Sequence, residues 1–157
     1  GTADFTKINF DITRTQPLPY GLSLFTAGAS QYSFDRLLAA EQFTVGGAFF
    51  GSAYDPAEIS GDHGVAGRAE LRYGKSLNDP MVNNFQVYAF YDIGRVWLEN
   101  ATDGSQSLAS AGIGLRTNFN ENLSANVELA DPLTRPATNQ GGHAKSPRLF
   151  FSVTGRF

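Results

Sequence analysis

Apolar and polar residues alternate along most of this chain of 157 residues. In residues 4–14, Ile8, Phe10 and Ile12 fall on one face of an extended chain, and the residues between them are polar. The same period of two recurs near residues 20–32, 65–73, 85–97, 109–116, 123–129 and 148–157. The pattern predicts seven strands, and an eighth only if Gln42 to Gly51 is extended.

Each predicted strand has one apolar and one polar face, and this asymmetry indicates the fold class. The polar face mixes glycine, serine and asparagine with charges of both signs, whereas the solvent face of a soluble barrel is usually rich in lysine and glutamate. An outer-membrane barrel turns its apolar face to lipid, with strands of about 9 to 11 residues, short turns at one end and long loops at the other. We therefore expect an all-β fold, an antiparallel transmembrane outer-membrane β-barrel, with a soluble lipocalin-like binder as the alternative.

The alternation is interrupted by a long inserted loop at about residues 34–62, within a single predicted β-barrel domain that spans residues 1–157. Its glycines permit positive φ angles and close backbone approach, and Pro56 prevents a regular strand from continuing. The glycines in and just after this loop are Gly46, Gly47, Gly51, Gly61 and Gly64. A loop of this length inside a compact β protein is usually functional.

Composition excludes several classes of function. The formal net charge is −3 and the lysines and arginines are dispersed, so we expect no nucleic acid as partner. The absence of cysteine excludes disulfides, thiolate metal sites and cysteine nucleophiles. No apolar run is long enough for a transmembrane helix, and the acidic residues lack the spacing of a calcium loop. We expect no metal, no cofactor and no enzymatic activity.

Two histidines, His63 and His143, lie in the glycine-rich connections. Nearby serines and acids would permit an acyl-transfer dyad like that of lipid hydrolases in small outer-membrane barrels. No nucleophile-elbow sequence or metal-ligand spacing accompanies these histidines. We therefore expect both to be loop histidines exposed to solvent.

Five short motifs follow one another in a fixed order. They are Leu38 to Gly47, Gly51-Ser52-Ala53-Tyr54-Asp55-Pro56, Ser60 to Gly64 followed by Arg68-Ala69-Glu70-Leu71, Phe90-Tyr91-Asp92-Ile93-Gly94, and Val153-Thr154-Gly155-Arg156-Phe157. Together they resemble the C-terminal barrel portion of two-partner-secretion outer-membrane transporters, of the hemolysin-activator and filamentous-hemagglutinin-transporter type, related to the BamA assembly barrels. In that family the motifs form an inward-folded loop, a return strand, an aspartate-bearing strand and a terminal strand.

The resemblance implies a barrel in the outer membrane of Gram-negative bacteria that exports an unfolded exoprotein. Residues 46–62 would act as plug or gate, and Phe157 would be the signal for the outer-membrane assembly machinery. The implied partners are outer-membrane lipid, a secreted polypeptide and that machinery. The loop residues implied are Gly46, Gly47, Gly51, Ser52, Ala53 and Tyr54.

Asp92 is the implied partner of the loop inside the barrel. In the family an arginine at the loop tip pairs with this aspartate, but Ser52 stands in that position here. Asp92 would then be solvated, become protonated, or recruit another base among Arg68, Arg72 and Arg116. We expect an arginine introduced at position 52 to bind Asp92.

The other charges predicted on the polar face suggest two arrangements. They are Asp11, Arg68, Glu70, Arg72, Arg116, Glu128, Arg148 and Arg156. Because both signs occur, they can form a cross-strand salt-bridge network, line a polar conduit that holds the loop, or do both.

Two sizes of barrel are compatible with the sequence. Family members have about sixteen strands, within the known range for such barrels, and this chain would then be the C-terminal half of one. Alternatively it is a self-contained eight-stranded barrel with a binding, anchoring or lipid-modifying role, since eight strands leave an interior filled by side chains.

Overall fold

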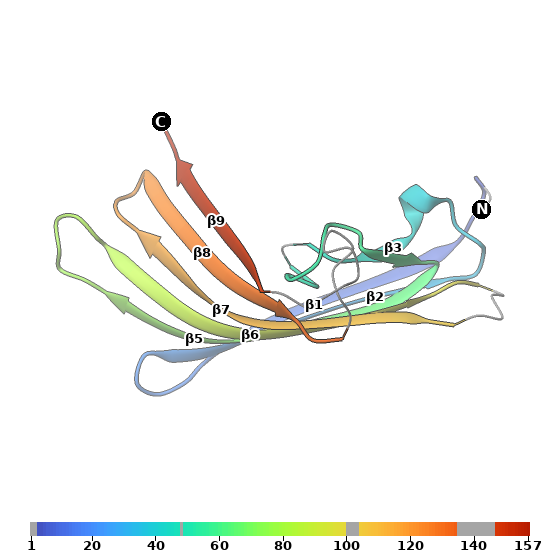
Figure 1. The fold of residues 1–157 in the computed structure, drawn as a ribbon, viewed down its shortest axis with the longest axis horizontal. Helices are drawn as coiled ribbons and strands as arrows, with labels where there is room; N and C mark the ends of the chain where they lie inside the picture. The colour runs from blue at the N-terminus through green and yellow to red at the C-terminus, as the bar shows by residue number, and fades with distance from the viewer. Residues whose placement is uncertain (1–2, 48, 100–103, 135–146) are drawn as a thin grey trace.

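The computed structural model describes residues 3–47, 49–99, 104–134 and 147–157. Seven strands form one sheet in the order β1-β2-β5-β6-β7-β8-β9, and every neighbouring pair is antiparallel (Figure 1). The strands are β1 (Lys7–Pro17), β2 (Leu22–Ser33), β5 (His63–Ser76), β6 (Asn84–Trp97), β7 (Gln106–Asn118), β8 (Leu123–Pro132) and β9 (Arg148–Gly155). The all-β antiparallel fold and the seven strands predicted from the alternation are confirmed.

The two faces of the sheet differ as the alternation predicts. Large apolar side chains on the convex face are exposed; Phe10 is 60% and Phe151 72% accessible. On the concave face, charged side chains such as Arg68, Glu70 and Asp92 are buried. This is the reverse of an ordinary soluble fold, in which buried positions are apolar and charges face water.

The described residues between Gln42 and Gly51 add no eighth strand to the large sheet. Among them β3 (Phe43–Val45) is extended, and it pairs with β4 (Ile59–Gly61) in a separate sheet of two strands. The backbone turns away immediately after β3, because Gly46 and Gly47 both adopt positive φ. Among the described residues β1 and β9 are the edges of an open sheet, so these strands do not make a closed eight-stranded barrel.

Residues 34–62, which we call the inserted segment, lie over the concave face of the curved sheet (Figure 1). The segment contains a single helical turn, η1 (Ala39–Glu41), in addition to β3 and β4. Its buried side chains pack against residues of the sheet in one apolar cluster that includes Val45, Tyr54, Ile59, Tyr88 and Leu108. No helix among the described residues is long and apolar enough to cross a membrane.

A glycine in β6 makes room for the inserted segment to pack against this strand. A Cβ atom added at Gly94 would lie 2.5 Å from Cγ1 of Val45, closer than real Cβ contacts. Glycine at this position therefore lets β3 approach the strand that carries Asp92, which fixes where the tip of the segment arrives.

Candidate functional site

The tip of the inserted segment is a compact turn that depends on glycine. The N–H of Gly46 donates to the carbonyl of Phe50 at 2.8 Å, and the N–H of Tyr54 donates to that of Gly51 at 2.9 Å. Gly46 has φ +123°, and a Cβ atom there would lie 2.2 Å from the carbonyl oxygen of Asp55. The turn directs the backbone of Gly51 and Ser52 toward the sheet.

The tip binds the carboxylate of Asp92 on β6. The N–H of Gly51 donates to Oδ1 at 2.9 Å, and the N–H and hydroxyl of Ser52 donate to Oδ2 at 3.3 and 3.1 Å. The hydroxyl of Ser110 on β7 also donates to Oδ1. Asp92 is fully buried, and neutral donors of the segment bind both of its oxygens.

Arg68 supplies the cation that the loop tip lacks. It lies directly opposite Asp92 in the β5–β6 register, and its Nη1 is 3.0 Å from Oδ2 of Asp92. The same nitrogen donates to Oγ of Ser52 at 2.6 Å and to the carbonyl of Phe49 at 3.4 Å. Among Arg68, Arg72 and Arg116, Arg68 is the base that binds Asp92. Its guanidinium already lies beside this carboxylate, where the side chain of an arginine at position 52 was expected to bind.

Arg72 and Arg116 bind Glu70 instead. The Nε of Arg72 lies 2.7 Å and Nη2 of Arg116 3.2 Å from its carboxylate oxygens, and Arg68 also donates to Glu70 at 2.8 Å. Glu128 on β8 completes the group, 3.4 Å from Arg68 and 2.6 Å from the hydroxyl of Tyr88.

These six residues form a charge cluster of three arginines and three acids, so its formal charge is zero. They are Arg68, Glu70, Arg72, Asp92, Arg116 and Glu128. A buried ion pair is costly to break by removing one partner, since the other charge is left uncompensated, at about 3–5 kcal/mol. The cross-strand network proposed from the sequence is present, and the inserted segment contacts it through Asp92 and Arg68.

The root of the inserted segment is fixed by a second buried aspartate, Asp62. Its Oδ1 accepts the N–H of Leu37 at 2.9 Å and the amide of Gln42 at 3.2 Å, and its Oδ2 accepts the N–H of Glu99 at 2.9 Å. Burial raises the pKa of Asp62, but these hydrogen bonds and the nearby His63 together lower it below its usual value of 3.8. The ionised form is therefore the one that holds the root together.

The prediction that His63 is a solvent-exposed loop histidine is wrong. His63 begins β5 and is only 3% exposed, because Tyr32 and Trp97 pack against its ring. Its Nδ1 accepts the N–H of Ser33 at 3.3 Å and its Nε2 lies 2.5 Å from Glu99. Both ring nitrogens are thus used in structural contacts. His143 lies outside the described residues.

The remaining predicted residues occupy different places. Ala53 and Tyr54 are fully buried at the tip, where the N–H of Ala53 lies 3.5 Å from Oγ of Ser110. Phe157 follows β9 and is fully exposed. Asp11 and Arg156 are exposed and form no ion pair with another described residue.

Three contacts at the site had no counterpart in the sequence analysis. Ser110 shares Asp92 with the tip, Asp62 holds the root, and Arg148 binds Asp55 of the segment at 2.8 Å. Ser110 stands opposite Asp92 in the β6–β7 register, which the period of two alone does not determine. Among the described residues, no three His, Cys, Asp or Glu side chains are grouped so that they could hold a metal ion.

An antiparallel sheet with an apolar outer face and an inner face of charges, covered by an inserted segment, defines the class of this protein. Residues 1–117 match the family model described as haemolysin secretion/activation protein ShlB/FhaC/HecB. The chain belongs to this family of two-partner-secretion transporters, as its motifs indicated. No curated protein and no solved structure matches the chain. The matched residues include the inserted segment, Arg68 and Asp92, whereas Glu128 and Phe157 lie beyond them.

Proposed function

We propose that this chain is part of an outer-membrane β-barrel that exports an unfolded exoprotein, with residues 46–62 as its plug or gate and no enzymatic role. The observation that carries the proposal is the seating of the tip on Asp92. The segment covers the polar inner face, yet Gly51 and Ser52 bind that face through backbone N–H groups and one hydroxyl. Such contacts hold a plug in place and can be exchanged for water when it moves.

The outer face supports a location in the bacterial outer membrane. Its exposed side chains are mainly aliphatic and aromatic, for example Ile8, Ile113 and Leu149, and most of the strands are long enough to span the hydrocarbon layer. The seven strands would be consecutive strands of a larger barrel, because β1 and β9 are free to pair with further strands. The described strands give no support to an eight-stranded barrel with a binding or lipid-modifying role.

A reversible crosslink tests whether the plug moves. Since the chain has no cysteine, Ala53→Cys and Ser110→Cys can be introduced together without competing thiols. The N–H of Ala53 lies 3.5 Å from Oγ of Ser110, so a disulfide there would fix the tip to β7. We expect oxidation to stop export of a co-expressed exoprotein encoded beside the transporter, and reduction to restore it.

Each single-cysteine variant serves as a control for the crosslink. Both should export equally with and without oxidant. Export that continues at the parental rate through the oxidised double variant would show that the segment is not a gate.

Phe157 is proposed as the signal recognised by the outer-membrane assembly machinery. Its ring is fully exposed, and an exposed aromatic ring near the end of a strand suits interfacial anchoring. Phe157→Ala should lower the yield of folded, heat-modifiable protein in the membrane, whereas Phe151→Ala on the outer face should not lower it to the same extent. Equal yields for Phe157→Ala and the parent would count against this role.

A further inference from the structure

Three adjoining hollows, the first two with a mainly polar lining, lie along the inner face of β7, β8 and β9. The first, which we call the mouth, is a hollow of about 330 Å³ at the end of the sheet where the short turns lie. A second hollow of about 270 Å³ shares Asn118, Ser124 and Thr154 with the mouth. A third, of about 210 Å³, shares Asn126 and Ser152 with the second. We call these three connected hollows the asparagine trough.

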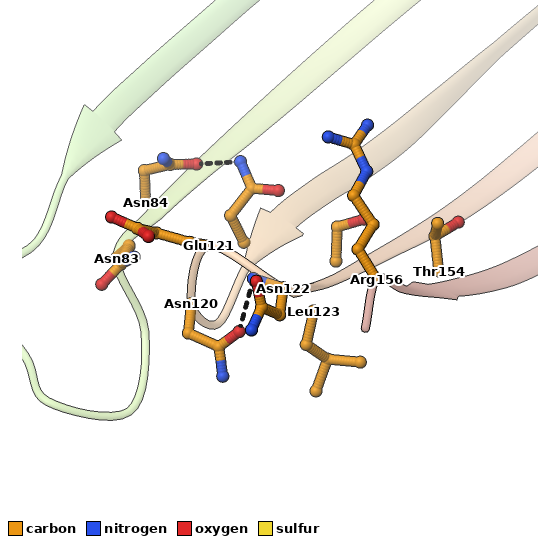
Figure 2. A pocket seen from close by; sticks show the side chains of 10 residues that line it. Asn83, Asn84, Asn120, Glu121, Asn122, Leu123, Thr154 and Arg156 are labelled. Carbon is orange, nitrogen blue, oxygen red and sulfur yellow. Dashed lines mark hydrogen bonds between the residues drawn. The ribbon is translucent and has the colours of Figure 1, made fainter.

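The lining of the mouth is rich in neutral amides. Five of the ten asparagines in the chain lie there, on two turns and the adjoining strand ends: Asn83, Asn84, Asn118, Asn120 and Asn122 (Figure 2). The only charged residues of the mouth are Glu121 and Arg156, which have opposite signs. The mouth therefore offers many hydrogen bonds without a net charge.

Part of this hydrogen-bonding capacity is used within the protein. The amide of Asn118 donates to the side-chain carbonyl of Asn84 at 2.9 Å, and the N–H of Asn122 donates to that of Asn120 at 2.8 Å (Figure 2). A side-chain amide has two donor hydrogens and two acceptor lone pairs, so each asparagine can make further bonds. These bonds orient the side chains of Asn84, Asn118 and Asn120 and leave donors and acceptors that they do not use.

We propose that the asparagine trough binds an extended segment of polypeptide through its backbone amide groups. This inference rests on the proposed export function, because the polypeptide would be the exported chain. Every peptide unit carries one N–H and one C=O, which neutral side-chain amides can match whatever the sequence. The connected shape suits a ligand that is long and narrow.

The lining favours a polypeptide over a carbohydrate or a nucleic acid. The first two hollows contain no aromatic ring on which a sugar or a base could stack. Arg116 and Arg156 are their only cations, too few for the phosphates of a nucleic acid.

The inner end of the trough meets the charge cluster. The third hollow is lined by Asn126 and Glu128, and the hydroxyl of Tyr88 donates to both, at 3.4 and 2.6 Å. Glu128 lies 3.4 Å from Arg68, which holds Asp92 and the tip of the inserted segment. A polypeptide that fills the trough therefore ends beside the base of the plug.

Single cysteines in this cysteine-free chain test the trough directly. Ser124→Cys and Ser152→Cys place a thiol in the lining, and Val127→Cys and Val153→Cys place one on exposed residues of the same two strands that line none of the three hollows and whose side chains point to the opposite face. Full-length protein in outer membranes is labelled with a small neutral thiol reagent. The probe is a soluble peptide of glycine, serine and asparagine, added in excess.

We expect the peptide to slow labelling of the two trough cysteines at least fivefold and to leave the two outer cysteines unaffected. A neutral oligosaccharide at the same concentration should not slow it. Protection by the oligosaccharide as strong as that by the peptide, or no protection by the peptide, would overturn the inference.

Removal of the amides gives a second measurement. Asn84→Ala combined with Asn118→Ala deletes both partners of one hydrogen bond, so no polar group is left alone, and should reduce the protection at Ser124→Cys to less than twofold. Asn78→Ala, an exposed asparagine outside the lining, should leave it unchanged. Undiminished protection in the double variant would also overturn the inference.

Export of the co-expressed exoprotein separates this inference from the proposed function. If the parent exports but the peptide protects no trough cysteine, the trough inference alone is wrong. If the peptide protects the trough cysteines and nothing is exported, the export function is wrong and the trough is still a polypeptide site.

Discussion

The inserted segment is fixed at two buried aspartates, and the two attachments are built differently. At the tip the carboxylate of Asp92 belongs to the sheet and the donors belong to the segment. At the root the carboxylate of Asp62 belongs to the segment, and the donors are Leu37 and Gln42 of the same segment and Glu99 after β6. The tip attachment joins the segment to the sheet, and the root attachment mainly joins the segment to itself.

The two aspartates are also compensated in different ways. Asp92 has a guanidinium at 3.0 Å within a cluster that extends over four strands, whereas Asp62 has backbone and side-chain N–H donors. In the proposed movement of the segment, the charges of the tip site would therefore stay in the sheet. We expect the segment to move about its root as one unit, with the root still closed.

The largest effect should follow removal of the cation at the tip. Arg68→Ala leaves Asp92, Glu70 and Glu128 without their shared partner and should destabilise the seated segment by about 3–5 kcal/mol. Limited proteolysis should then cut near residues 47–56. Arg148→Ala, which removes a partly exposed ion pair to Asp55, should cost only about 0–1 kcal/mol and serves as the control. Equal proteolysis of the two variants would show that Arg68 does not hold the tip.

A smaller effect is expected at the root. Asp62→Asn replaces an acceptor of three hydrogen bonds by an amide that can keep only some of them, at a cost of about 1.5–3 kcal/mol. New cleavage should appear at residues 36–42 while the tip stays protected. Simultaneous cleavage at tip and root would show that the two attachments are one cooperative unit.

The Ser52→Arg exchange should be unfavourable, contrary to the expectation from the sequence. Position 52 is fully buried and its hydroxyl lies 2.6 Å from Nη1 of Arg68, so a second guanidinium would meet a like charge in filled space, at about 1–3 kcal/mol. In the background of Arg68→Ala the same exchange should instead restore protection of the tip, because the new arginine replaces the lost cation. Additive losses in the double variant would disprove this interchange.

The smallest effect concerns pH. The pKa of Asp62 is lowered in the folded state, so its contribution to stability is complete above its usual value of 3.8 and is lost as the pH falls through the folded value. Trp97, the only tryptophan, stacks on the adjacent His63 and reports on the root by its fluorescence. The difference in emission between the parent and Asp62→Asn should be constant from pH 7 to 5 and should shrink as the pH falls below the usual value of 3.8. Comparison with the variant isolates the contribution of Asp62 to this change.

The strands could be predicted from the sequence because the alternation of apolar and polar residues that marks a strand is a local pattern. A period of two places Ile8, Phe10 and Ile12 on one face whatever lies next to β1. The pairing of Arg68 with Asp92 depends instead on the register between β5 and β6, which periodicity alone does not determine. For that reason three arginines were equal candidates before the fold was known.

Burial of polar residues was the least predictable property. His63 has glycine and aspartate neighbours, and in the sequence these indicate a loop. Its burial is tertiary, since Tyr32 of β2 and Trp97 of β6 lie against its ring. Asp62 was missed for the same reason, because two of its donors, Leu37 and Glu99, are far from it in the chain.

The neutrality of the tip has an electrical consequence. Residues 46–54 contain no ionisable side chain except the phenol of Tyr54, and Arg68 stays on β5. A formal charge that crosses the whole membrane potential changes the energy by about 2.3 kcal/mol per 100 mV. Withdrawal of this tip carries no such charge, whereas a tip with an arginine would carry one. In the plug proposed for residues 46–62, the tip therefore adds no charge that responds to voltage, and the acids that would move with it are Asp55 and Glu58.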